Sequence, residues 1–175
     1  MTTQRDKNAV AVVGLGNLLM RDDGFGVHVV NALEEGGPML GVEVWDFGTS
    51  PLDMLGVFLD HEKVIVVDAV RAGHAPGTVY RFSSEFLAET ADGKMSSHDL
   101  RLLDLLGMVR MLGSAPEVVI YGAEPEEITE ALGLSRTAET AMQRVTQLVR
   151  DEALRGACSR DVVAEQSGLR VFAMT

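Results

Sequence analysis

Short apolar runs rich in β-branched residues recur along the chain, and segments with helical periodicity separate most of them. This alternation predicts an α/β fold, in which helices cover both faces of a mostly parallel sheet to give three layers. The predicted strands cover residues 10–13, 42–45, 64–67, 78–82 and 118–121, and the predicted helices cover residues 24–35, 51–59, 99–112 and 137–154.

The third and fourth predicted strands interrupt the alternation. About ten residues join them, and these include Gly73, Pro76 and Gly77. A parallel crossover needs a longer connection, usually a helix. We therefore expect a β-hairpin here, with one antiparallel strand in the sheet.

The size of the chain suits one globular domain. Its 175 residues, 46% of them hydrophobic, are enough to bury roughly 70% of the surface that the unfolded chain exposes. Helical periodicity fades after Leu154. We therefore expect a single α/β domain over residues 1–155 and a loosely ordered C-terminal tail over residues 156–175.

The net charge indicates which type of partner the protein can bind, and the cysteine content indicates which covalent links and metal sites it can form. The formal charge of -11 would repel a phosphate backbone, so nucleic acid is an unsuitable partner and a basic peptide an easier one. Cys158 is the only cysteine, which excludes an internal disulfide and a cysteine-based zinc cluster. The polar start of the chain lacks the apolar region of a signal peptide, and no apolar run is long enough to span a bilayer. These features predict a cytoplasmic protein without a membrane partner.

The first apolar run ends in Gly14-Leu15-Gly16, which invites a dinucleotide-binding interpretation. That fingerprint needs a third glycine three residues later, and Leu19 occupies its place. Acidic residues at the start of the next helix would also repel a pyrophosphate. We interpret the glycines as residues that allow a tight turn after the strand.

Two adjacent acids, Asp22 and Asp23, follow this turn. One acid suffices to cap a helix and to complement its dipole. A second acid, with Gly24 and Gly26 beside it, predicts a ligand site with room close to the backbone.

Asp68 and His98 are the other candidates for a site. Asp68 directly follows a run of buried apolar residues, where a charged carboxylate is costly unless it is paired or bound. His98 follows two serines at the predicted start of a helix, and the positive end of a helix keeps an imidazole neutral and able to bind a metal. The other histidines, His28, His61 and His74, are interpreted as surface or space-filling residues.

Together these side chains predict an Asp/Asp/His site at the carboxyl edge of the sheet, where open α/β sheets usually bind ligands. Two oxygen ligands and one imidazole suit nickel, zinc or another divalent ion, with coordination positions left open. The chain has no HExxH motif and no serine in a nucleophile elbow, so neither a conventional zinc protease nor a serine hydrolase is expected.

A set of short motifs, in a fixed order over residues 9–154, resembles the hydrogenase maturation proteases. These endopeptidases remove a C-terminal extension from the large subunit of nickel–iron hydrogenases. The motifs are Gly14-Leu15-Gly16-Asn17 with Asp22-Asp23-Gly24-Phe25-Gly26, Asp46-Phe47-Gly48-Thr49, Val66-Val67-Asp68-Ala69, Ala75-Pro76-Gly77-Thr78, Ser97-His98, Tyr121-Gly122-Ala123-Glu124-Pro125 and Gly133-Leu134-Ser135.

The resemblance implies a twisted five-stranded sheet between helices, and it implies roles for individual residues. The family's metal ligands fall on Asp23, Asp68 and His98, although well-known members carry Glu where this chain has Asp23. Asp22 is then left as the helix cap. The nickel is expected to arrive already inserted in the large-subunit precursor, and the protease is expected to be a monomer.

Two routes to hydrolysis stay open, a metal-polarised carbonyl or metal-bound water and a carboxylate acting as general base. Two other classes of protein are alternatives. A non-catalytic metal- or nucleotide-binding α/β module would bind its ligand without cleaving a precursor. An RNA-directed hydrolase would need a basic groove, against which the charge of -11 argues.

Overall fold

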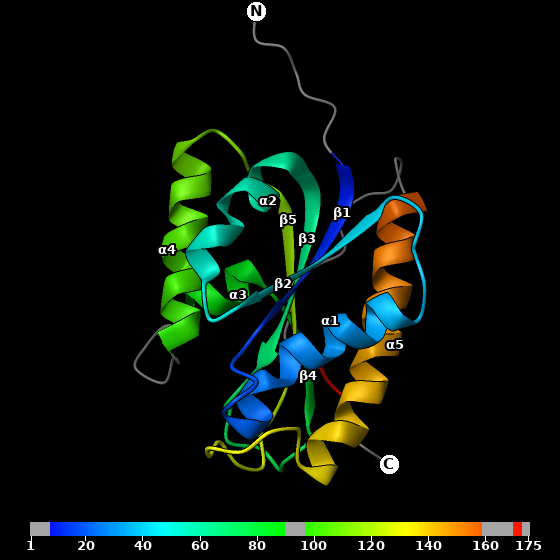
Figure 1. Ribbon diagram of the computed structural model, residues 1–175. Helices are drawn as coiled ribbons and strands as arrows, with labels where there is room; N and C mark the ends of the chain where they lie inside the picture. The colour runs from blue at the N-terminus through cyan, green and yellow to red at the C-terminus, as the bar shows by residue number, and fades with distance from the viewer. Residues whose placement is uncertain (1–7, 90–96, 159–169, 173–175) are drawn as a thin grey trace, which may run out of the picture.

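The computed structural model has a single mixed β-sheet as its middle layer, with helices on both faces (Figure 1). The structure describes residues 8–89, 97–158 and 170–172; within these ranges, the side chains of residues 8, 51, 87–89, 97–101 and 170–172 are not among those described. Over these ranges, no helix is both long enough and apolar enough to cross a membrane.

All five predicted strands form, which confirms the α/β fold and the mostly parallel sheet. A three-residue strand, β6, extends the sheet at one edge. The strand order is β2-β1-β3-β5-β4-β6, and β4 runs antiparallel to both of its neighbours, β5 and β6, whereas the pairs among β2, β1, β3 and β5 are parallel. The bounds are β1 Asn8–Leu15, β2 Val42–Gly48, β3 His61–Ala69, β4 Val79–Ser83, β5 Glu117–Ala123 and β6 Arg170–Phe172.

The predicted β-hairpin between β3 and β4 is wrong, because β5 lies between them. Tyr121 of β5 pairs with Val67 of β3 on one side and with Arg81 of β4 on the other. β5 is buried from Val118 to Ala123, as expected of a strand covered on both faces. The short β3–β4 connection brings the two strands to the same part of the sheet without making them neighbours.

Two groups of helices cover the sheet, and successive residues of each central strand face alternate groups. The α1/α5 face packs on Ile65 and Val67 of β3, and the α2/α4 face packs on Val64 and Val66. The helices are α1 Phe25–Glu35, α2 Leu55–Asp60, α3 Ser84–Glu89, α4 Ser97–Met111 and α5 Arg136–Cys158, with 3-10 turns η1 Arg21–Gly24 and η2 Pro51–Met54.

Residues 156–158, predicted to open a loosely ordered tail, instead continue α5. Ala157 packs against the core under α1 and α5. A Cβ on Gly156 would lie only 3.0 Å from a methyl group of Val10, so the helix lies close against the sheet here. Residues 170–172 of the predicted tail form β6. The rest of that tail, 159–169 and 173–175, lies outside the described residues.

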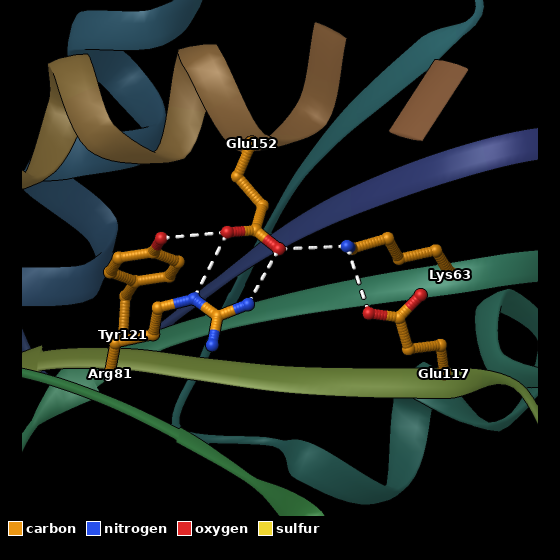
Figure 2. Close-up of polar contacts among 5 residues, drawn as sticks. All are labelled: Lys63, Arg81, Glu117, Tyr121 and Glu152. Carbon is orange, nitrogen blue, oxygen red and sulfur yellow. Dashed lines mark hydrogen bonds and ion pairs between the residues drawn. The ribbon is translucent and has the colours of Figure 1, made fainter. Parts of the chain in front are cut away.

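A buried polar cluster joins α5 to the sheet (Figure 2). The Glu152 carboxylate accepts hydrogen bonds from Lys63 Nζ at 2.8 Å, from Arg81 Nε and Nη2 at 3.0 and 2.8 Å, and from the Tyr121 hydroxyl at 2.9 Å. Lys63 also pairs with Glu117 at 2.9 Å. Burial alone would raise the pKa of Glu152, but the bonds from Arg81 and Lys63 outweigh it and lower the pKa to about 2. The cluster therefore holds a carboxylate ionised inside the core.

Candidate functional site

Asp68 lies near the carboxyl end of β3, where the sequence predicted a ligand. Because Val64 and Val66 face α2 and α4, alternation along the strand directs Asp68 to the same face. The side chain is buried, with 6% of the residue exposed. One oxygen, Oδ1, accepts a hydrogen bond from the backbone N–H of Ala69 at 2.8 Å.

Glycines bring the loop that carries Asp23 against this end of the sheet. A Cβ on Gly26 would lie 2.0 Å from the carbonyl oxygen of Val67, and one on Gly14 would lie 2.5 Å from the carbonyl oxygen of Gly26. The start of α1 therefore rests directly on β1 and β3. A Cβ on Gly24 would similarly meet the backbone of Leu18 at 3.1 Å. The prediction that Gly24 and Gly26 leave room for a ligand is wrong, since the protein's own backbone fills that space.

Asp23 is half-buried in η1, which contacts β3. Its Oδ2 accepts a hydrogen bond from the backbone N–H of Asn17 at 3.2 Å. The turn that leads from β1 into Asn17 passes through Gly16, whose φ of +135° requires glycine. This confirms the tight turn expected after β1. Asp23 and Asp68 thus lie on neighbouring segments at the same edge of the sheet.

Asp22 is not a helix cap, because its carboxylate reaches a distant loop. With only 1% of the residue exposed, Oδ2 accepts from the N–H groups of Glu126 and Glu127 at 2.9 and 3.2 Å, and from Ser135 Oγ at 2.8 Å. Oδ1 accepts from the Ser135 N–H at 2.7 Å. Burial alone would raise the pKa of Asp22, but these hydrogen bonds, led by those from Ser135, lower it below its usual value.

Glu124 is a third buried carboxylate at this edge, after Asp68 and Asp22, and the sequence analysis missed it. It accepts hydrogen bonds from the N–H groups of Ala72, Gly73 and His74, at 2.9 to 3.3 Å, and from the Tyr80 hydroxyl at 2.5 Å. Burial and the bond to Glu124 raise the pKa of Tyr80. Glu124 therefore ties the loop that follows β3 to the end of β5. A sequence signal existed, because the acid directly follows a buried apolar strand.

His61 and His74 both make polar contacts with other residues of the protein. His61, interpreted from the sequence as a surface or space-filling residue, begins β3 and is buried. Its Nδ1 donates to the Val57 carbonyl oxygen at 2.8 Å, and its Nε2 lies 3.3 Å from a carboxylate oxygen of Glu43. The exposed His74 forms a 3.1 Å hydrogen bond with Tyr80. None of these partners points to a metal.

The structure brings two of the three predicted ligands to one edge and leaves the third untested. His98 is the second residue of α4, but its side chain lies outside the described residues. Among the side chains that the structure describes, no group of three His, Cys, Asp or Glu residues could hold a metal ion. The Asp23/Asp68/His98 site therefore remains a prediction.

Comparison with known proteins identifies the family. The family model described as hydrogenase maturation protease matches residues 27–152. The chain is 32% identical over 143 residues to the hydrogenase 2 maturation protease of Escherichia coli strain K12, an alignment that covers 80% of this chain and 87% of that protein.

Solved structures agree with this match. The hydrogenase maturating endopeptidase HybD from E. coli superposes with a TM-score of 0.76 at 30% identity, covering 93% of this chain and 95% of that one. The hydrogenase 2 maturation peptidase from a Thaumarchaeota archaeon superposes with a TM-score of 0.64 at 32% identity, covering 82% and 96%. The chain therefore belongs to the hydrogenase maturation protease family and is a peptidase.

Proposed function

We propose that this protein is the endopeptidase that removes the C-terminal extension of a nickel–iron hydrogenase large-subunit precursor after nickel has been inserted. The observation that supports the proposal is the shared edge of Asp23 and Asp68, where glycine-mediated packing sets η1 against the end of β3. Two acidic side chains near one buried strand end suit the binding of a cation better than a purely structural role.

The position of α4 supports His98 as the third group. Leu102, Leu105 and Val109 of α4 are buried in the core on the face toward which Asp68 points. The helix has 15 residues, or roughly 22 Å of length, and is followed by β5, which starts at the opposite edge. Its first turn is therefore expected near the carboxyl edge. We propose that Asp23, Asp68 and His98 bind the nickel of the precursor.

In this proposal nickel is part of the substrate, and zinc or another divalent ion could occupy the same three side chains. The protein's own contribution is recognition: it binds the nickel-bearing precursor and orients the scissile peptide at the carboxyl edge. A precursor without nickel lacks that point of attachment and is left intact. We place this processing in the cytoplasm and expect the protease to act as a monomer.

The test is cleavage of purified precursor with and without nickel, followed by intact mass. We expect only the nickel-loaded precursor to lose its C-terminal extension. Asp68→Asn and His98→Ala should abolish cleavage while circular dichroism stays native. Glu117→Gln is the matched control, since Glu117 is an exposed acid at the opposite edge, and it should cleave normally.

Three outcomes would contradict the proposal. Equal cleavage of both precursors would remove the role of nickel. Full activity of Asp68→Asn or His98→Ala would remove the metal site. Binding of the precursor without any loss of mass would favour the non-catalytic metal-binding module.

A further inference from the structure

Three leucines are exposed on two loops beside the candidate site. Leu18 and Leu19 lie between β1 and η1, and Leu132 lies in the loop between β5 and α5; the exposed fractions are 38%, 66% and 77%. We call these three residues the leucine patch. Large apolar side chains gathered on the surface of a soluble protein commonly mark a place where a partner binds.

Backbone hydrogen bonds hold the two loops of the leucine patch side by side. The Ala131 N–H donates to the Leu19 carbonyl oxygen at 3.1 Å, and the Arg21 N–H donates to the Ala131 carbonyl oxygen at 2.9 Å. Met20 and Ala131 form a parallel bridge. The buried Asp22 carboxylate then fixes the rest of the second loop, as described above. The patch is therefore built into the fold before any partner arrives, which lowers the entropic cost of binding.

Exposed acidic residues lie in the same loop as one of the three leucines of the leucine patch. Glu126 and Glu130 are exposed on the same loop as Leu132, whereas Glu127 is paired with Arg21. With a formal charge of -11 for the whole chain, a second copy of this protein would be repelled from the surface. A partner with Lys or Arg near an apolar side chain fits it instead.

We propose that the leucine patch docks the hydrogenase large-subunit precursor, through an apolar segment of the precursor that is flanked by Lys or Arg side chains. The inference rests on the proposed function and adds a binding surface to it. Leu19 precedes Asp23 by four residues in the connection between β1 and α1. A precursor held on the patch therefore has its neighbouring segment beside the edge that carries Asp23 and Asp68.

The test compares the kinetics of two double variants on nickel-loaded precursor. Leu19→Gln with Leu132→Gln makes the patch polar without adding charge. We expect KM to rise about tenfold or more, since the complex would no longer bury two leucine side chains, each of which contributes about tenfold in affinity when fully buried. The value of kcat should change by less than about threefold. Because both side chains are exposed, the melting temperature should stay unchanged.

The matched control is Met111→Gln with Leu112→Gln. These side chains are 88% and 62% exposed and lie at the end of α4, just before β5 begins at the opposite edge. We expect KM within about twofold of wild type. A third variant, Glu126→Gln with Glu130→Gln, should raise KM and weaken its dependence on salt.

Binding is measured separately by surface plasmon resonance with immobilised precursor, so that docking and cleavage are judged apart. Weaker binding by the leucine variant but not by the control supports the docking surface, even if wild type binds without cleaving. Equal KM and equal affinity in both double variants would overturn it. It would also be overturned if wild type sediments as a dimer that the leucine variant converts to a monomer of unchanged KM. If wild type cleaves the precursor and both double variants have the KM and affinity of wild type, the leucine patch is refuted as a docking surface, but the proposed endopeptidase function stands.

Discussion

Substitution of Glu152 offers a direct measure of what the buried polar cluster contributes. Glu152→Gln keeps the size of the side chain and removes its charge. Lys63 still pairs with Glu117 at 2.9 Å, but the described residues offer Arg81 no other carboxylate. Removing one partner of a buried ion pair costs about 3–5 kcal/mol. We expect the lower end, about 3 kcal/mol, because Lys63 retains a partner.

The pKa of Glu152 gives a second route to the same magnitude. A pKa lowered from 4.5 to about 2, at about 1.4 kcal/mol for each pH unit, corresponds to about 3 kcal/mol. Since the folded-state pKa is the lower one, this stability is fully present above pH 4.5 and is lost as the pH falls toward 2. The difference between wild type and Glu152→Gln should therefore be full at pH 7 and should narrow below pH 4.5.

The assays are urea unfolding and thermal unfolding, each followed by circular dichroism at several pH values. At about 2–4 °C for each kcal/mol, the melting temperature at pH 7 should fall by about 6–12 °C. Glu117→Gln serves as the control, because its exposed pair with Lys63 should contribute less than about 1 kcal/mol. A loss below about 1 kcal/mol for Glu152→Gln, or a difference that stays constant from pH 5 to pH 2, would refute the reasoning.

Two further predictions concern the edge of the sheet. Asp22→Asn should lower the free energy of unfolding by about 2 kcal/mol or more in urea, since buried N–H donors lose a charged acceptor; a loss of only about 1 kcal/mol would be that of an ordinary cap. Gly26→Ala should cost about 3 kcal/mol or prevent recovery of folded protein, because its Cβ would lie 2.0 Å from a β3 carbonyl oxygen. Gly56→Ala is its control: a Cβ there meets nothing within 4 Å, so this variant should be as stable as wild type or gain up to about 1 kcal/mol, and an equal loss in both variants would contradict the steric argument.

The strands could be predicted from sequence because each contains a short stretch rich in β-branched and aromatic residues, which is a local property. In β1, β3 and β5 that stretch is continuously apolar and buried. The order of the strands could not be predicted. The short β3–β4 connection limits how far apart the two strands lie. Which strand lies beside β3 depends on which one is apolar enough to be buried by helices on both faces of the sheet. That comparison involves β5, which begins with Glu117, more than 30 residues after β4 ends at Ser83.

The candidate site was only partly predictable for a similar reason. Asp68 carries a local signal, a charge at the end of a buried run. Asp22 carries the signal of a helix cap, yet its partner Ser135 lies 113 residues away. A glycine such as Gly26 indicates only that a Cβ is missing, and the sequence does not say whether a ligand or the protein's own backbone takes that space.

The position of β5 between β3 and β4 means that a partly synthesised chain could pair β3 with β4 directly, a pairing that is absent from the folded protein. During synthesis β4 is complete before β5 exists, and the β3–β4 connection is short enough for a hairpin. Until residues 117–123 emerge, β3 has an open apolar edge on that side, and unpaired strand edges favour mispairing and aggregation. Because β5 pairs with both β3 and β4 in the native sheet, any direct β3–β4 pairing formed earlier must be broken to reach that order. Chains that end before residue 117 should accordingly aggregate as they leave the ribosome.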